Sequence, residues 1–199
     1  MPKSKIIRQK AKATLDNKPF KSGWLWPLLI LMIQSAVISA LGSLSLVVSA
    51  VIGVASATYF MALARRTAEA GSIKTYFLAY RHKIGSNIVL SVIQGLYLLL
   101  WGFVPFMGII KHYSYAMTYY IKVENPDLTA NEVITKSREM MFGYKWKLFC
   151  LDLSFIGWYL RELIPLGVAS LWIAPYKAAA YAHFYEELKE IRANEIIIE

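Results

Sequence analysis

The amino-acid sequence predicts an all-α protein, a polytopic membrane helix bundle with six transmembrane helices in three hairpins and additional cytoplasmic interfacial helices. Of its 199 residues, 57% are hydrophobic and only 18% are charged, with a mean hydropathy of +0.42. Soluble domains usually carry about 25% charged residues. From Gly23 to Ala64 there is no Asp, Glu, Lys or Arg. A soluble helix needs a polar face, which this stretch does not provide.

Six apolar segments are expected to span the membrane. The fourth is the weakest, because it is short and contains a lysine, a histidine and four tyrosines. The segments are predicted over residues 24–41, 44–64, 84–103, 109–121, 146–163 and 166–185, in a single transmembrane domain (23–188) between a basic cytoplasmic segment (1–22) and a cytoplasmic tail (189–199).

The second segment carries a stripe of small side chains. Ser45, Ser49, Gly53 and Ala57 recur every four residues. Such a stripe lets a neighbouring helix approach closely where hydrophobicity cannot drive association. The stripe therefore predicts packing and no chemistry.

A further amphipathic helix is predicted over residues 130–142, at the cytoplasmic interface. Thr129 and Glu132 form a Thr-x-x-Glu capping box at its start. Gly143 suits the left-handed conformation that commonly ends a helix. At eleven to thirteen residues, or roughly 20 Å at the helical rise, the helix is too short to span a bilayer.

The basic residues predict the orientation. With the amino terminus in the cytoplasm, all but two of the 22 Lys and Arg residues lie on the cytoplasmic side, the exceptions being Lys111 and Arg161. This is the bias that the positive-inside rule describes, and it places both termini in the cytoplasm. The basic residues expected to face the interface and its anionic lipids are Lys3, Lys5, Arg8, Lys10, Lys12, Arg65, Arg66, Lys145 and Lys147.

The N-terminal segment also carries Ile7, Ala11 and Leu15 at helical spacing, which predicts a short interfacial helix. The net charge of +9 would suit nucleic-acid binding. Because the charges stand at the ends of apolar runs, no nucleic-acid partner is predicted. The expected partners are the lipid bilayer, with its anionic cytoplasmic leaflet, and other membrane proteins.

Asp152 is the only acidic residue well inside a predicted span. Lys177 lies at the same depth if the last hairpin turns near Ile164 and Pro165. An ionisable group in a membrane is costly and marks a functional site by default. Two interpretations stay open, a structural ion pair that fixes helix register and a substrate or proton site. The candidate intramembrane polar site consists of Asp152, Lys177, His112, Tyr115 and Tyr119.

Other polar residues inside the spans, Gln34, Asn87 and Gln94, are expected to bridge helices rather than bind a ligand. The histidines are scattered and Cys150 is the only cysteine, so no metal site, disulfide or cofactor is predicted. No nucleophile motif, phosphate loop or pair of spaced carboxylates appears, so no catalytic residue is assigned. An enzyme is the poorer hypothesis.

The C-terminal half resembles a known family. The resemblance lies in the sequence from Asn125-Pro126-Asp127-Leu128-Thr129 through Ser137-Arg138-Glu139-Met140-Met141 to Gly143-Tyr144-Lys145-Trp146-Lys147, and in Leu171-Trp172-Ile173-Ala174-Pro175-Tyr176. This pattern resembles a bacterial integral membrane family named domain of unknown function 975, which is similar to the membrane domain of some glycerophosphodiester phosphodiesterases. Tyr144 departs from the histidine expected there, and the region of Gly167 is less glycine-rich than expected. The resemblance implies a multi-pass protein of the bacterial plasma membrane and brings no catalytic residues.

The leading hypothesis for function is a non-enzymatic membrane module that binds partners in the cell envelope. The alternative is a small transporter or lipid-handling protein with a polar intramembrane site near Asp152 and Lys177. A lipid-modifying enzyme is a third possibility, and it would require a pocket with convergent polar groups.

Overall fold

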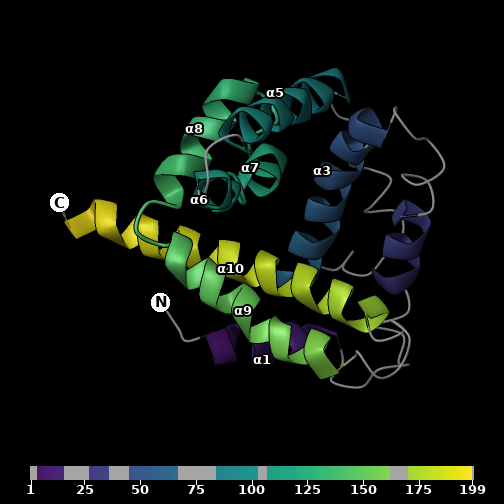
Figure 1. The fold of residues 1–199 in the computed structure, drawn as a ribbon. Helices are drawn as coiled ribbons and strands as arrows, with labels where there is room; N and C mark the ends of the chain where they lie inside the picture. The colour runs from purple at the N-terminus through teal and green to yellow at the C-terminus, as the bar shows by residue number, and fades with distance from the viewer. Residues whose placement is uncertain are drawn as a thin grey trace.

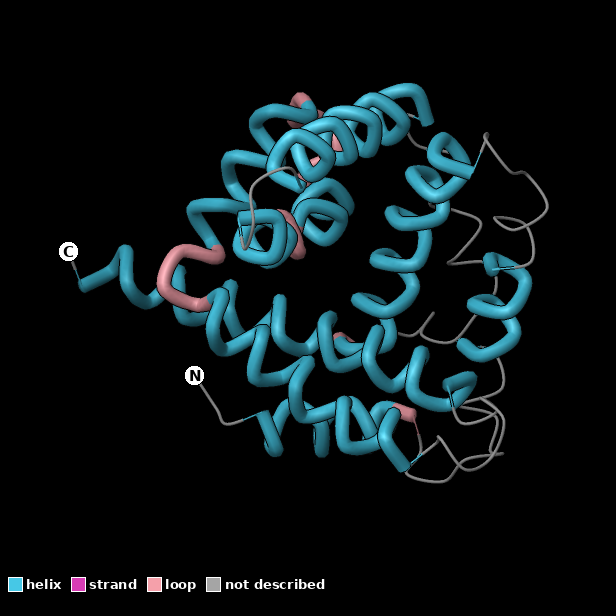
Figure 2. Tube along the Cα trace, in the orientation of Figure 1, coloured by secondary structure: helices cyan, strands magenta, loops and turns pink. Residues whose placement is uncertain are grey.

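The computed structural model describes residues 4–15, 27–35, 45–66, 84–102, 107–161 and 170–198. Within these ranges every regular element is an α-helix (Figure 2), which confirms the all-α prediction. Residues 27–35 are helical. The other helices are α1 (Ser4–Thr14), α3 (Ser45–Ala64), α5 (Ile84–Gly102), α6 (Met107–Ser114), α7 (Thr118–Glu124), α8 (Ala130–Met140), α9 (Lys145–Arg161) and α10 (Ser170–Ile198).

Helix α10 is the element around which the others are arranged. It has 29 residues, about 43 Å at the helical rise, and it contacts α1, α3, α8 and α9. In Figure 1 it crosses the molecule with α9 beside it. The predicted span ends near residue 185, and the tail after it is expected to begin as helix and then fray. The helix continues to Ile198, because neither Gly nor Pro follows Tyr185 and charged side chains beyond it bind other helices.

The predicted third hairpin is present as α9 and α10. Lys177 Nζ lies 3.0 Å from Asp152 Oδ1, and the rings of Phe155 and Tyr176 meet edge to face with centroids 5.1 Å apart. These pairs are nearly equidistant in sequence from the predicted turn. The two helices are therefore antiparallel, in the register that the sequence predicted.

The predicted second hairpin is present as α5 with α6 and α7 returning along it. At one end Lys111 Nζ lies 4.2 Å from the centroid of the Trp101 ring. At the other end Lys122 Nζ donates to Ser86 Oγ at 2.6 Å. These two contacts fix α5 and the returning segment as antiparallel neighbours.

The returning segment is not the single helix predicted over 109–121. Helix α6 ends at Ser114 and α7 begins at Thr118. The Ser114 carbonyl accepts a hydrogen bond from Ser137 Oγ at 2.9 Å, and the Thr118 amide bonds instead to the Tyr115 carbonyl at 3.2 Å. Because residues 109–124 contain neither Gly nor Pro, the break coincides with a bond from α8 rather than with a local helix breaker.

Two of the three polar side chains inside the predicted spans, those of Gln34 and Gln94, bridge helices as expected. Gln34 Nε2 donates to Ser56 Oγ at 2.6 Å, which joins residues 27–35 to α3. Gln94 Oε1 accepts from Thr118 Oγ1 at 2.7 Å, which joins α5 to α7. Asn87 is buried on α5.

The ends of α8 confirm the local predictions. The Thr129 side chain accepts from the Glu132 amide, and the Glu132 carboxylate accepts from the Thr129 amide at 2.7 Å. Gly143 has φ of 77°, which is left-handed. Val133 and Ile134 form the buried side of the helix.

The position of α8 changes which charged residues lie together. The helix packs on α5 and α7. Lys111, Arg138 and Lys145 consequently line one cavity of about 550 Å³. The prediction placed Lys111 on the outer side of the membrane and Lys145 on the cytoplasmic side. The structure brings them together because α8 carries the chain along the hairpin.

Helix α1 forms as predicted, but protein covers its apolar face. Ile7, Ala11 and Leu15 are buried, and the helix contacts α3, α9 and α10. The Arg8 guanidinium donates to the Ser154 carbonyl at 3.0 Å. The basic N-terminal helix is therefore part of the folded core.

The predicted close approach on α3 occurs at Gly53. A Cβ atom added there would lie 2.9 Å from Cζ of Tyr119 on α7. The Tyr119 hydroxyl lies 3.2 Å from Ser91 Oγ on α5, which holds the ring in place. A side chain at position 53 would therefore require the Tyr119 ring to shift where α3 meets α7.

We predict that Gly53→Ala lowers the free energy of unfolding by about 1–3 kcal/mol through overpacking, even though alanine favours helix by ~1 kcal/mol over glycine. Thermal unfolding in detergent measures this. The matched control is Gly95→Ala on α5, where an added Cβ meets nothing within 4 Å, and no loss is expected. Equal effects of the two substitutions would contradict the close approach.

Candidate functional site

Asp152 lies where α6, α9 and α10 meet. Its Oδ1 is 3.0 Å from Lys177 Nζ. Its Oδ2 accepts hydrogen bonds from the Tyr113 hydroxyl at 3.0 Å and from the Tyr181 hydroxyl at 2.7 Å. The predicted ion pair therefore forms. The sequence analysis did not predict either tyrosine as a partner of Asp152, although Tyr181 lies one helical turn after Lys177 and thus on the same face.

The arrangement balances the charge of Asp152. The Asp152 side chain is 15% exposed and that of Lys177 is 37% exposed. Oδ1 has the ammonium group at ion-pair distance without a well-aligned hydrogen bond, so the attraction there is Coulombic. A carboxylate that binds one cation and two hydroxyl donors is well suited to holding three helices together.

The remaining residues of the predicted polar site do not join this cluster. His112 is exposed, and its ring packs edge to face on Tyr113 with centroids 5.6 Å apart. Tyr115 is buried in the core. Tyr119 reaches Ser91 on α5. Only the aspartate and the lysine of the predicted set are bound to each other.

A second polar cluster, which the sequence analysis missed, surrounds Glu124 at the end of α7. Its Oε1 accepts from Lys189 Nζ at 2.6 Å and contacts the Arg65 guanidinium. Its Oε2 accepts from the Tyr185 hydroxyl at 2.7 Å. Arg65 Nε in turn donates to Glu186 at 2.7 Å. This cluster ties the end of α3 and the end of α7 to α10.

The electrostatics of the cluster favour ionised Glu124. Burial by itself raises the pKa of this carboxyl. Hydrogen bonds from Lys189, Tyr185 and Arg65 outweigh burial and hold the pKa below its ordinary value. In the sequence, Glu124 stands in the last turn of an apolar helix that also contains tyrosines. This pattern is too weak a signal to predict Lys189, Tyr185 and Arg65 as its partners.

Lys122 is another residue that the sequence analysis treated only as a cytoplasmic charge. It is 2% exposed. Its ammonium group donates to Ser86 Oγ, to the Pro126 carbonyl at 3.0 Å and to the Leu128 carbonyl at 2.6 Å. A lysine in the last turn of a helix is a recognised partner for nearby carbonyls, and that was the available signal.

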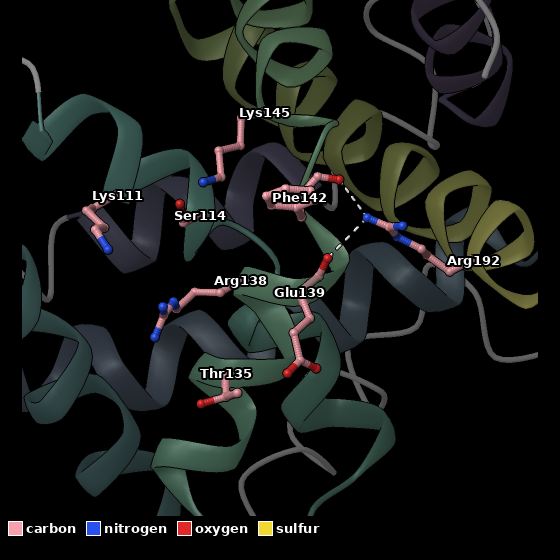
Figure 3. A pocket seen from close by; sticks show the side chains of 8 residues that line it. All are labelled: Lys111, Ser114, Thr135, Arg138, Glu139, Phe142, Lys145 and Arg192. Atoms are coloured by element: carbon pink, nitrogen blue, oxygen red, sulfur yellow. Dashed lines mark hydrogen bonds between the residues drawn. The ribbon is translucent and has the colours of Figure 1, made fainter. Parts of the chain in front are cut away.

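Arg192 on α10 caps the C-terminal end of α8. Its guanidinium donates to the carbonyls of Glu139 at 3.1 Å and Phe142 at 2.6 Å (Figure 3), and to the Met140 carbonyl at 3.2 Å. The same group lies 5.0 Å from the centroid of the Tyr144 ring. The last carbonyls of a helix lack part of their intrahelical hydrogen bonds. Arg192 supplies donors at this end of α8 and shares the Glu139 carbonyl with the Phe142 amide.

Several basic residues predicted to face lipid bind protein groups instead. Arg8 and Arg65 make the contacts described above, and Lys10 Nζ lies 2.7 Å from Glu187 Oε1. Acidic residues on α10 account for two of these three contacts. Of the others, Lys5, Lys12, Arg66 and Lys147 are exposed, Lys145 lines the cavity with Lys111, and Lys3 lies outside the described residues.

These features define an all-α protein built from antiparallel helical hairpins and joined by polar clusters along one long helix. The chain belongs to the family described as "Protein of unknown function (DUF975)", whose model matches residues 5–192. The family resemblance drawn from the sequence is thereby confirmed. No curated protein and no solved structure matches the chain, so the likeness to the membrane domain of phosphodiesterases stays a prediction.

We predict that Asp152→Asn lowers stability by about 1–3 kcal/mol, because Lys177 loses its counter-ion in a partly buried site. Unfolding in detergent measures the loss. The double variant Asp152→Asn/Lys177→Met should lose less than the sum of the two single variants, as expected for residues in contact. Strict additivity would mean that the pair contributes no interaction energy.

We predict a pH-dependent loss for Glu124→Gln. Because the pKa of Glu124 is lowered on folding from its ordinary value of 4.5, its stabilisation is complete above that value and disappears as the pH falls through the folded pKa. The stability gap between wild type and variant should thus be largest near neutral pH and close in acid. Glu190→Gln, which removes an exposed charge from α10, should show no such gap.

Proposed function

We propose that the protein is an integral, multi-pass protein of the bacterial plasma membrane. In this proposal it acts as a non-enzymatic module that binds partner proteins in the envelope. The observation that carries membrane integration is the exposed apolar face of α5. There Val89, Val92, Leu96, Leu99 and Leu100 each expose more than half of their surface.

The degree of burial distinguishes a membrane-spanning helix from the core helix of a soluble protein, both of which can have the composition of α5. Residues 84–101 form the one stretch in the described part of the chain that is long and apolar enough to cross a membrane. Core helices of soluble proteins have similar lengths and compositions, but they are mostly buried. Only 11% of this stretch is buried, so hydrocarbon is the surrounding that suits it.

Exposed apolar side chains also continue beyond α5. Ile109 and Ile110 are exposed on α6, and Met32 and Ile33 are exposed on the helical residues 27–35. Soluble monomers rarely expose contiguous apolar patches larger than a few hundred Å². These residues support lipid contact at more than one helix.

The state of the polar groups supports a non-enzymatic role. Both oxygens of Asp152 are engaged by a lysine and two tyrosines, and Glu124 is engaged by three side chains. A carboxylate in a transport or catalytic cycle has to exchange its partners. The alternative, a small transporter or lipid-handling protein working through Asp152 and Lys177, requires this cluster to open.

The six crossings and the cytoplasmic position of both termini stay part of the proposal. Lys111 and Lys145 line one cavity, so we amend the predicted topology and place these two residues on the same side of the membrane. Because Lys145 is predicted to be cytoplasmic, the amended topology makes Lys111 cytoplasmic as well. The amendment fits the positive-inside rule better than the original placement.

We predict that the protein stays in the membrane pellet after alkaline carbonate treatment and enters solution only with detergent. Single cysteines at positions 111 and 145, in a Cys150→Ser background, should react with an impermeant maleimide from the same side of the membrane. Release by carbonate would overturn membrane integration. Reaction from opposite sides would overturn only the amendment and support the original sidedness.

A further inference from the structure

A cavity of about 550 Å³ lies between α6, α8 and α9 near the end of α10. Lys111 comes from α6, Arg138 from α8 and Lys145 from α9. In Figure 3 the charged ends of these three side chains point into the same space. Residues far apart in sequence thus supply three cations to one site.

The three cations are not neutralised within the described part of the chain. No carboxylate there lies within ion-pair distance of Lys111, Arg138 or Lys145. Arg192 also lines the cavity, but its donors are occupied by carbonyls of α8 and by Glu195. Glu139 is the one carboxylate among the lining residues. Positive charge therefore exceeds negative charge in the cavity.

Like charges repel one another, so their convergence costs energy unless an anion binds between them. Arginine and lysine are the usual partners of phosphate oxygens. The Thr135 hydroxyl also faces the cavity and provides a further donor (Figure 3). The donor set fits a phosphate group.

Exposed apolar side chains in and next to the cavity-lining segments distinguish a lipid from a free ion. Phe142 lines the cavity and is 75% exposed. Ile109 and Ile110 precede Lys111 in sequence and Trp146 follows Lys145, and all three are exposed. Cations beside exposed aromatic and aliphatic side chains match a ligand with a charged head and apolar chains. Inorganic phosphate has no apolar part that could contact these side chains.

We propose that Lys111, Arg138 and Lys145 bind the phosphate headgroup of an anionic phospholipid, whose acyl chains lie along Ile109, Ile110, Phe142 and Trp146. The proposal rests on membrane integration, because that is what brings lipid to the cavity. It names a specific lipid site on a protein otherwise expected to contact the anionic leaflet only through scattered charges.

The test is binding of phosphatidylglycerol to the purified full chain in neutral detergent, measured by native mass spectrometry and by titration. The variant Lys111→Gln/Arg138→Gln/Lys145→Gln should bind roughly a hundredfold more weakly, at about fivefold for each charge removed. The control, Lys136→Gln/Lys147→Gln, removes two exposed charges from α8 and α9 and should change binding less than twofold. Unfolding temperatures without lipid check that both variants are folded.

Each outcome decides the matter. Equal losses in the two variants would overturn the site in favour of general surface charge. Competition by millimolar inorganic phosphate that is as strong as that by the lipid would overturn the lipid source. Equal binding of phosphatidylcholine would overturn recognition of anionic headgroups. Because carbonate extraction tests membrane integration separately, a protein that stays in the pellet but does not bind phosphatidylglycerol would refute this inference alone.

Discussion

The structure depends on matching six polar side chains of α10 to groups on other helices. A charged side chain placed among apolar helices costs free energy unless a partner satisfies it. On α10 the partners come from five different parts of the chain, so each match also fixes the position of another element. The pairs are Lys177 with Asp152, His183 with Thr14, Glu186 with Arg65, Glu187 with Lys10, Lys189 with Glu124, and Arg192 with the end of α8.

The parts of the fold that could be predicted from the sequence are those set by local signals or by register. The capping box at Thr129 and the left-handed Gly143 depend on residues within one helical turn. The pairing of Asp152 with Lys177 follows from counting outward from a turn. The close approach at Gly53 follows from small residues at a spacing of four. In each case few alternative partners exist, so the sequence pattern alone is enough to predict the contact.

The remaining features depend on contacts between residues far apart in sequence. The break after Ser114 coincides with a hydrogen bond from Ser137, and no composition signal marks it. The cluster around Glu124 needs residues from three helices whose charges, in sequence, look like any cytoplasmic charge. The basic cavity was missed for the opposite reason, because the topology prediction separated Lys111 from Lys145. Orientation rules describe average charge and do not place individual helices such as α8.

The cap that Arg192 provides has a consequence for biosynthesis. Helix α8 leaves the ribosome some fifty residues before the side chain that completes its C-terminal end. The buried face of α1 is likewise covered by α9 and α10, which are made later. Since chains are synthesised from the amino terminus, α1 and α8 have to wait for α10. The packing of these helices is thus completed only after α10 has been synthesised, rather than one finished hairpin at a time.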